Sequence, residues 1–548
     1  MQHNIFGHMD LQLRLAIVED NATARTNLRS HLLPFGCFDI HSFSNGNELR
    51  SALKRQPIDV VIIDYHLGQH KNGVECIEGL KLSGHIKPST GVFFITADRA
   101  PKTIAQIMEL HPDMLIVKPY TMGMLTKHIE KYLVFRQLVT DVLNHMDNGI
   151  YDLALRHMKD LILDAQPVNA NTHRFMPELN KLFARLLVYT GFYSSAVTLY
   201  DSILQRSDKV LWAQWGKIKC QYLLGEWSAC ENILQHLVKT NLTRDKAFEW
   251  LACLSAEREL YEQTSDFLEN IKVTDLTMSA TKLITLAYRK QNKVIEGIDL
   301  LQRQREHNRS TRDRFEEFTY ELAEFYIAIA EETPLKQREE SLSQARKLIG
   351  MAARGESDMQ LKLKKDVLLA YSATLEGDNE KAQKLIGDLN MLALQSAQPS
   401  AQFCAAKVLF SIGHKENGKA LLNRAEAQLE KAEDQTWRSV MTIGLNDSEK
   451  TLGLDQQKAV DLNEEGMVLF ANKQAEKAMP LFFEAFQRIP TMPAFSLNLL
   501  QCLVELNRTS FRHITTGHLL EQLSQLSLNQ ANQQRLDRIQ KLMARESC

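Results

Sequence analysis

Five side chains that could carry out chemistry together follow short apolar stretches near the start of the chain. They are two adjacent carboxylates, a single carboxylate, a hydroxyl and an ammonium: Glu19 and Asp20, Asp64, Thr96, and Lys118. Crowded carboxylates repel one another and favour a bound cation, and oxygen ligands of this kind suit Mg²⁺. A metal-bound carboxylate beside a hydroxyl and an ammonium can accept a phosphoryl group, because the cations neutralise the transferring oxygens. We therefore expect an aspartyl phosphate to form on Asp64.

These side chains need elements that bring them to one place, and the surrounding sequence predicts a parallel sheet. Val60 to Ile63 are all β-branched, which suits a strand buried on both faces and ending at Asp64. Strand-like and helical stretches alternate, with strands at 11–18, 39–43, 60–64, 91–95 and 114–117, and helices at 22–33, 47–55, 74–82 and 102–110. Asn21 is placed to cap the first helix. This pattern predicts an α/β, doubly wound, five-stranded parallel sheet whose strand ends meet at one edge.

In order and position, these residues resemble the receiver domain of two-component response regulators, over Leu13 to Val134. The motifs that carry the resemblance are Val18-Glu19-Asp20, Ile63-Asp64, Ile95-Thr96-Ala97 and Val117-Lys118-Pro119. The resemblance implies a flavodoxin-like receiver in which Asp64 is the phosphoacceptor, assisted by Thr96 and Lys118. It also implies that Asp20 binds Mg²⁺ directly, that Glu19 binds it through water, and that the His66 backbone carbonyl completes the protein ligands.

Two positions depart from the receiver pattern. Leu67-Gly68 replaces the Met-Pro that commonly follows the acceptor, which is a loop variation. Leu115 stands three positions before the lysine, where the family has an aromatic switch residue. We therefore expect the output to travel by a route other than the usual threonine–aromatic coupling. His66 and His70 lie near Asp64 in sequence, and we expect both to be solvent-exposed loop histidines.

The rest of the chain lacks strand signals and repeats itself. Apolar spacing runs unbroken from Leu125 to Met146, so we expect the last receiver helix to continue into the next domain. Further on, Tyr193, Trp227 and Tyr261 are 34 residues apart (227 − 193 and 261 − 227). This period, with a turn glycine before the aromatic and a small residue after it, resembles the tetratricopeptide repeat. The clearest single copy extends from Asn463 to Pro490.

These patterns divide the chain into segments. They are an N-terminal tail at 1–12, the receiver at 13–135, a connecting helix at 136–150, tetratricopeptide-like repeats at 151–308, a helical linker with degenerate repeats at 309–432, an irregular connection at 433–456, a further repeat at 457–492, and capping helices at 493–548. The expectation of irregular backbone at 433–456 comes from Gly444-Leu445-Asn446-Asp447, which is typical of a turn. The charged stretch from Arg303 to Glu317 is expected to be a solvated turn.

Composition limits the classes of function. Lys and Arg number 65 against 67 Asp and Glu, a formal charge of −2, which gives no general attraction to nucleic acid or an anionic membrane. The eight cysteines show neither a CxxC pair nor zinc spacing, so we expect buried, reduced thiols in a cytoplasmic protein without a membrane span. Walker, HExxH and GxSxG motifs are absent, so the expected catalysis is limited to the receiver's own phosphorylation and dephosphorylation.

The two halves predict a response regulator with a protein-binding output. A histidine kinase or phosphotransfer protein would phosphorylate Asp64, and the repeat surface would bind a protein partner, either the sensor kinase or another response regulator. The whole chain resembles receiver–tetratricopeptide proteins, which include auxiliary regulators of three-component sensory systems. One alternative is a nucleic-acid-binding regulator, against which the near-neutral charge and the missing helix-turn-helix argue. The other is a phosphatase of a sister receiver, for which the sequence singles out no acid or amide.

Overall fold

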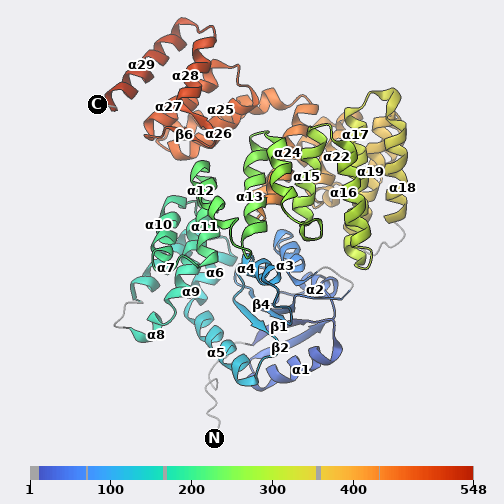
Figure 1. The fold of residues 1–548 in the computed structure, drawn as a ribbon, viewed down its shortest axis with the longest axis vertical. Helices are drawn as coiled ribbons and strands as arrows, with labels where there is room; N and C mark the ends of the chain where they lie inside the picture. The colour runs from blue at the N-terminus through green and yellow to red at the C-terminus, as the bar shows by residue number, and fades with distance from the viewer. Residues whose placement is uncertain (1–11, 69–71, 165–168, 353–358, 431, 547–548) are drawn as a thin grey trace. The chain divides into compact units, whose positions relative to one another are not determined.

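The computed structural model describes residues 12–68, 72–164, 169–352, 359–430 and 432–546, and shows one parallel sheet followed by a long helical region (Figure 1). The predicted N-terminal tail lies outside the described residues, apart from Gln12. The chain divides into two compact units: unit 1 comprises Met1–Gln221, His236–Ala247 and Leu300–Thr319, and unit 2 comprises Tyr222–Gln235, Phe248–Asp299 and Tyr320–Cys548. In the part of the chain that the structure describes, no helix is long and apolar enough to cross a membrane.

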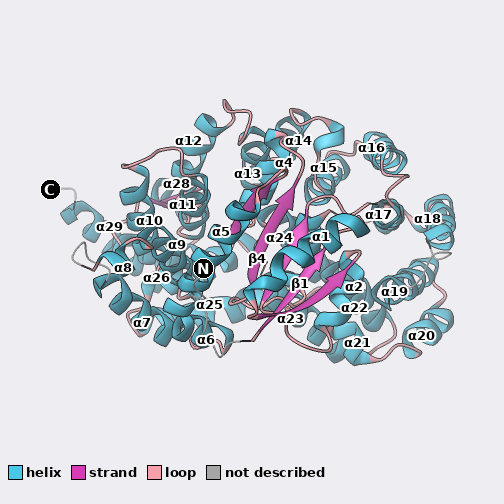
Figure 2. Ribbon diagram, turned by 90° about the horizontal axis from the view of Figure 1, so that it is seen from below, coloured by secondary structure: helices cyan, strands magenta, loops and turns pink. Residues whose placement is uncertain are grey.

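The strands of unit 1 form the predicted parallel sheet, in the order β2-β1-β3-β4-β5, and Figure 2 shows them side by side. Their bounds are β1 Leu13–Val18, β2 Phe38–Phe43, β3 Val60–Asp64, β4 Gly91–Thr96 and β5 Met114–Val117. Every residue of β3 and β4 is buried, as expected of central strands that are covered on both faces. The predicted doubly wound fold is confirmed.

Alternate residues of the strands face two apolar cores, one on each side of the sheet. The helices that cover the sheet are α1 Ala22–Leu32, α2 Gly46–Leu53, α3 Gly73–Leu82, α4 Pro101–Glu109 and α5 Met122–Leu138, with a 3₁₀ turn, η1, at Leu33–Phe35. Ala16 and Val18 of β1 pack in the core with α2, α3 and α4, whereas Leu15 and Ile17 pack with α1 and α5. Asn21 caps α1 as predicted, because its side chain accepts a hydrogen bond from Ala24 N (3.0 Å).

The predicted continuous helix at 125–146 is wrong at one residue. α5 ends at Leu138 and α6 spans Thr140–Asp147, because Val139 between them takes φ −103° and ψ 16°. Thr140 Oγ1 donates to the Arg136 carbonyl oxygen (2.9 Å), a bond to residue i−4 that often bends helices. The β-branched Val139 also has a low helix propensity. The connection from the receiver therefore consists of two helices with a bend between them.

The remaining described elements are helical apart from one short hairpin. The helices are α7 Tyr151–Asp164, α8 Ala170–His173, α9 Met176–Tyr189, α10 Tyr193–Leu204, α11 Leu211–Leu223, α12 Trp227–Leu237, α13 Arg244–Glu257, α14 Tyr261–Glu269, α15 Met278–Lys290, α16 Val294–His307, α17 Arg312–Glu332, α18 Glu339–Ala352, α19 Met359–Glu376, α20 Asn379–Gly387, α21 Met391–Gln395, α22 Pro399–Ser411, α23 Lys415–Leu429, α24 Gln435–Thr451, α25 Asp455–Ala471, α26 Ala475–Arg488, α27 Pro493–Glu505, α28 Thr516–Gln525 and α29 Gln530–Glu546. The 3₁₀ turns are η2 Val273–Asp275 and η3 Leu335–Gln337, and the hairpin pairs β6 Ser510–Phe511 with β7 Ile514–Thr515. The described cysteines are buried, apart from Cys404, which is partly exposed.

The 34-residue period appears in the structure as a repeat of helix starts. Helices α10, α12 and α14 begin at the three predicted aromatic residues, Tyr193, Trp227 and Tyr261. Two residues before each start the backbone takes a positive φ, which is 77° at Gly191, 73° at Gly225 and 61° at Glu259. Three residues after each start the side chain is fully buried, at Ala196, Cys230 and Thr264. Small buried residues at these positions let the paired helices approach each other, as the repeat resemblance implies.

The predicted irregular connection at 433–456 is wrong, because α24 occupies most of it. Asp434 caps this helix, its side chain accepting a hydrogen bond from Thr436 N (3.0 Å). Gly444 serves close packing and not a turn, since a Cβ there would lie 3.3 Å from the ring of Phe403 on α22. The turn comes later, at Gly453, where φ is 70°.

The predicted copy at Asn463 to Pro490 falls on the helix pair α25 and α26. Gly466 lies where the two helices meet, and a Cβ at this position would come within 2.7 Å of the Phe482 ring. Ala478 and Ala485, on α26, are fully buried in the same cluster. The consensus positions of this copy therefore serve the packing of one helix on the other.

Candidate functional site

The register of the sheet brings polar side chains from four strands to one edge of unit 1. Val18 pairs with Ile63, so Glu19 follows β1 at the level of Asp64, the last residue of β3. The next strand, β4, ends one residue further along at Thr96, and Lys118 follows β5 directly. Parallel strands that end together form the crevice in which α/β proteins place their ligands.

Lys118 lies between the two buried carboxylates of this edge. Its Nζ donates to Asp64 Oδ2 (2.6 Å) and to Glu19 Oε2 (2.8 Å). The exposed fractions of the side chains are 26% for Lys118, 10% for Asp64 and 8% for Glu19. Charges that are partly buried in this way are screened by salt much less than charges at the surface. The ammonium therefore holds both carboxylates in place and offsets their mutual repulsion.

The pKa values of Lys118 and Glu19 respond to burial and to their neighbours. Burial opposes the charge of Lys118, but the hydrogen bonds to Asp64 and Glu19 outweigh it and raise the pKa of the lysine. Burial raises the pKa of Glu19, and the charge of Asp64 adds to this effect while Lys118 opposes it. Two ionised carboxylates with one ammonium leave an excess of negative charge at the edge. A second cation would relieve that excess.

The residues that would hold a magnesium ion are Asp20, Asp64 and the carbonyl group of His66, with Glu19 acting through water. Asp20 is exposed, and its carboxylate lies over Gly68, where a Cβ would come within 3.0 Å of Asp20 Oδ2. Among the described residues, no three or more His, Cys, Asp or Glu side chains are grouped so that they could hold a metal ion. Mg²⁺ needs only one or two carboxylates and keeps several waters, so this set of oxygen donors fits it.

Thr96 is fully buried at the end of β4, and its Oγ1 accepts a hydrogen bond from Asp98 N (3.1 Å). Leu115, at the position of the family's aromatic switch, pairs in register with Phe94 and packs against the core beneath α2, α3 and α4. An aliphatic side chain offers neither a ring nor a hydroxyl that could follow a movement of the threonine. A threonine–aromatic pair therefore does not form between positions 96 and 115.

His66 is largely exposed, as predicted, with 65% of its side chain in solvent, whereas His70 lies outside the described residues. The Nε2 atom of His66 lies 3.5 Å from Oδ2 of Asp98, a residue that was not among the predicted site residues. Asp98 accepts hydrogen bonds from Thr103 Oγ1 (2.7 Å) and Ala100 N (2.8 Å), and these bonds lower the pKa of its carboxyl group. An ionised Asp98 thus faces the exposed histidine that follows the acceptor.

Three further residues near the acceptor were missed in the sequence. Tyr65 donates its hydroxyl hydrogen to Gln106 Oε1 on α4 (2.6 Å). Glu75 forms a capping box with Asn72 at the start of α3, and it also accepts two hydrogen bonds from Arg314. The Asn-x-x-Glu spacing is a known helix-start pattern and could have been found. No local pattern marks Arg314, which was assigned to a solvated turn but lies on the first turn of α17.

One comparison, with a model of a protein-domain family, agrees with this geometry. Residues 15–130 match the family model of the response regulator receiver domain. Similar solved structures include a beryllofluoride-activated DrrB receiver domain, which is 19% identical and aligns with 22% of this chain and 98% of its own at a TM-score of 0.20. The Vibrio cholerae chemotaxis protein CheY4 is 18% identical, with coverage of 22% and 98% and a TM-score of 0.20. A tetratricopeptide repeat protein from Parabacteroides merdae is 15% identical, with coverage of 54% and 99% and a TM-score of 0.33. No curated protein matches the chain significantly.

Proposed function

We propose, from the premise that a response regulator receiver domain at residues 15–130 is followed by helical repeats, that this chain is a response regulator phosphorylated on Asp64. The observation that carries the proposal is the position of Lys118, whose ammonium bonds both Asp64 (2.6 Å) and Glu19 (2.8 Å) at the strand ends. A structural ion pair needs one carboxylate and one cation. Two buried carboxylates that share one ammonium leave an excess of negative charge, and such an arrangement is suited to binding a further cation.

In the proposed reaction, a carboxylate oxygen of Asp64 attacks the phosphorus of a phosphohistidine. An O–P bond forms while the P–N bond of the donor breaks, and the leaving imidazole nitrogen keeps the electron pair. Lys118 holds the acceptor carboxylate beforehand and then bonds a phosphoryl oxygen, and the Thr96 hydroxyl donates to another. A Mg²⁺ ion held by Asp20, Asp64 and the His66 carbonyl, with Glu19 acting through water, supplies charge neutralisation when bound.

The proposed output is protein binding by the helical repeats. The small consensus residues of the repeats are buried, at Ala196, Cys230, Ala478 and Ala485, so recognition would use exposed residues of the helices. The partners that suit a regulator of this type are a histidine kinase or phosphotransfer protein as donor, and the sensor kinase or another response regulator on the repeat surface. The proposed site of action is the cytoplasm.

Phosphorylation is tested by intact mass. The purified chain, incubated with a small phosphodonor and Mg²⁺, is expected to gain the mass of one phosphoryl group, and chelation of the metal should prevent the gain. The Asp64→Asn variant should gain none. A wild-type chain that takes up no phosphoryl group, or an Asp64→Asn variant that takes up as much as wild type, would contradict the proposal.

The output is tested with the stable phosphoryl mimic beryllofluoride. The full chain serves as bait for candidate kinases and response regulators, with and without the mimic, and with Asp64→Asn as the control that cannot respond. We expect the affinity of a true partner to change roughly 5- to 150-fold, the usual range of coupling between two sites. Equal affinity in both states for every bound partner would indicate a constitutive scaffold.

A further inference from the structure

The start of α3 lies directly against the backbone of the phosphoacceptor. A Cβ added at Gly73 would come within 2.3 Å of the Asp64 carbonyl oxygen, so no side chain fits between the two segments. Gly73 N also donates to the carbonyl oxygen of Tyr65 (2.8 Å). Because this contact is both close and bonded, a shift of the first turn of α3 moves the backbone that carries Asp64.

A reciprocal pair of hydrogen bonds fixes that turn, and we refer to residues 72–75 as the α3 cap. Asn72 Oδ1 accepts from Glu75 N (2.9 Å), and Glu75 Oε2 accepts from Asn72 N (3.1 Å). These bonds satisfy two N–H groups that the helix itself leaves unpaired. Asn72 Nδ2 also lies 3.4 Å from the Tyr65 hydroxyl, which bonds Gln106 on α4. The α3 cap therefore connects the residue after Asp64 with two helices.

Arg314 bonds both carboxylate oxygens of Glu75. Its Nη2 donates to Oε1 (2.8 Å) and its Nε donates to Oε2 (3.2 Å), which is the same oxygen that accepts from Asn72. The side chains are 33% and 29% exposed. Exposed ion pairs usually contribute little, but this pair is bidentate, mostly buried and shares an oxygen with a helix cap. It therefore holds the position of the α3 cap.

Arg314 is held on its own side as well. Its Nη1 lies 3.5 Å from Asn308 Oδ1, and Asn308 Nδ2 donates to the carbonyl oxygen of Gln304 at the end of α16 (2.8 Å). Asn308 and Gln304 are both buried. The connection between α16 and α17 is thus built around the guanidinium that bonds Glu75. All of these residues belong to unit 1, as does the receiver.

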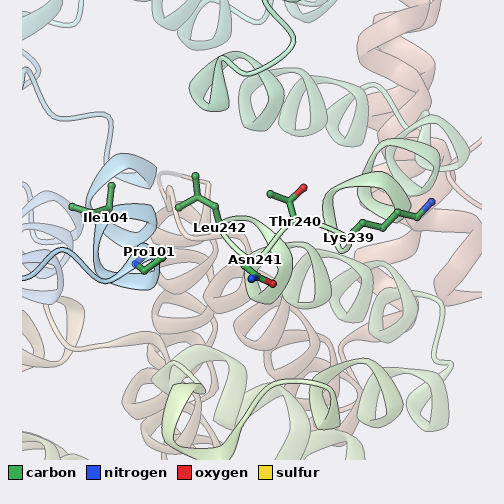
Figure 3. Close-up of a pocket in the computed structure, with 6 residues that line it drawn as sticks. All are labelled: Pro101, Ile104, Lys239, Thr240, Asn241 and Leu242. Atoms are coloured by element: carbon green, nitrogen blue, oxygen red, sulfur yellow. The ribbon is translucent and has the colours of Figure 1, made fainter.

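The other helix beside the acceptor is α4, and its first turn contacts the α12–α13 connection more loosely. Pro101 and Ile104, on the first turn of α4, border a cavity of about 690 Å³ that is completed by residues 239–242 of the α12–α13 connection (Figure 3). At the far end of α4, Glu109 Oε2 lies 3.5 Å from Lys246 Nζ. A small displacement of the first turn of α4 would be taken up by this space. The α3 cap, by contrast, is joined to Arg314 by direct bonds.

We propose that Arg314 is a positioning residue for phosphoryl acceptance at Asp64, acting through Glu75 and the α3 cap. Phosphorylation in turn changes how well ordered the backbone is in the connection between α16 and α17. This inference rests on the proposed function of Asp64. Arg314 touches no reacting atom. Its influence is on the geometry of the backbone on which the acceptor carboxylate is mounted. Because coupling between two sites is reciprocal in free energy, an ion pair that favours the phosphorylated state is favoured by phosphorylation in turn.

The test combines a rate with a structural readout on the full chain. The initial rate of mass gain at Asp64, with phosphoramidate and Mg²⁺, is expected to fall at least roughly 5-fold in Arg314→Gln, the lower end of usual couplings. Glu75→Gln retains a capping residue but loses the charge, and is expected to match that fall. The double variant should be no slower than either single variant. Arg314→Lys, which keeps the charge but not the two-bond geometry, should lie between wild type and Arg314→Gln.

Hydrogen exchange supplies the reciprocal readout. Beryllofluoride is expected to change deuterium uptake in peptides covering residues 304–314 of wild type, and not in Arg314→Gln. The matched control is Arg309→Gln on the same connection, whose side chain is 78% exposed, and it should behave as wild type in both measurements. A role limited to local folding would alter uptake without the mimic but leave the response to the mimic intact.

The outcomes separate the inference from the proposed function. If wild type gains no phosphoryl mass, the function of Asp64 fails and this inference fails with it. If wild type is phosphorylated but Arg314→Gln and Glu75→Gln react at the rate of Arg309→Gln, only the inference is overturned. Additive losses in the double variant would likewise overturn action through Glu75. If Arg314→Gln does not fold, Glu75→Gln and Arg314→Lys decide the matter.

Discussion

The strand-end edge of the receiver and the turns of the helical repeats use regular spacing for opposite purposes. At the edge, residues that are far apart in sequence converge, and Lys118 bonds carboxylates that are 54 and 99 residues away. In the repeats, helix starts recur every 34 positions, at Tyr193, Trp227 and Tyr261. Convergence raises the pKa values of Lys118 and Glu19 at the edge, whereas recurrence distributes similar side chains through a core.

The difference is clearest in what surrounds each set of residues. Burial opposes the charge of Lys118, but its hydrogen bonds to Asp64 and Glu19 raise its pKa, whereas the pKa of Glu19 is raised mainly by burial. Ala196, Cys230 and Thr264 are fully buried, and burial raises the pKa of the Cys230 thiol to about 12, which keeps it protonated and inert. The edge residues thus combine burial with hydrogen-bonded opposite charges, whereas these repeat residues pack in the core.

The largest expected effect comes from removing the shared cation. Lys118→Met should reduce the rate of Asp64 phosphorylation by about 10²–10³-fold, the usual loss when one stabilising donor is removed from a developing charge. The rate is followed by intact mass at saturating Mg²⁺. Lys127→Met, on the exposed side of α5, is the control and should react as wild type. A Lys118→Met variant that stays within about threefold of that control, less than about 1 kcal/mol, would place the chemistry elsewhere.

The repeats can be tested with a matched pair of glycines 34 residues apart. Gly225 has φ 73° and a Cβ there would come within 2.4 Å of the Phe511 ring, whereas Gly191 has φ 77° and nothing within 4 Å. Gly225→Ala should therefore destabilise the protein by about 2–4 kcal/mol, from the left-handed backbone and the clash together. Gly191→Ala should cost about 1–2 kcal/mol, from the backbone alone.

Chemical denaturation of the two variants measures this difference, and neither should alter phosphorylation of Asp64. Equal losses of stability would show that the turn glycine at 225 has no packing role. A slower phosphorylation rate in Gly191→Ala would show that a turn of the repeats affects the reaction at Asp64, which would contradict the comparison of the two regions.

A smaller effect is expected on the stability of the isolated receiver when its C-terminal boundary is moved. The sequence predicts a folded receiver ending near Phe135, but Arg136 Nη1 donates to the Ser89 carbonyl oxygen (2.6 Å) and to the Tyr132 hydroxyl (3.0 Å). A fragment ending at Leu138 should therefore be more stable than one ending at Phe135 by about 1.5–3 kcal/mol, the contribution of a charged hydrogen bond. Thermal melting of both fragments measures the difference. Coincident melting curves would show that Arg136 does not belong to the receiver's fold.

The smallest expected effect is the loss of stability on acidification that comes from His513. Burial and the neighbouring Arg258 and Arg512 lower the pKa of His513 to about 4, against about 6.5 in an unfolded chain. Between these values the unfolded state binds the extra proton, so stability is present above pH 6.5 and is lost as the pH falls toward 4. The loss should stay near 1 kcal/mol, because the ring remains partly in solvent.

The measurement compares the stability of wild type and His513→Gln at pH 7 and pH 5. Wild type should lose more stability than the variant on acidification, while phosphorylation of Asp64 in the two should respond to pH alike. A variant as acid-sensitive as wild type would assign the effect to other groups.

The sequence by itself determined the receiver fold and its strand-end edge, because each of the five residues ends or follows an apolar strand and parallel strands must end together. It also determined the 34-residue period, since the helices α10, α12 and α14 begin at the three aromatic residues that carry it. These features depend on local patterns that the residues carry with them. The same reasoning explains why Asn21 was correctly placed as a helix cap.

Only the tertiary structure decided the features that depend on distant neighbours. In the sequence alone Gly444 indicates a turn, whereas in the structure it lies beside the Phe403 ring. Val139 fits a helical pattern in the sequence, whereas in the structure the next residue, Thr140, bonds the carbonyl oxygen of Arg136. The pairing of Arg314 with Glu75 spans 239 residues. A charged residue in a polar stretch looks solvated in the sequence, because the carboxylate that removes it from water is supplied by another part of the fold.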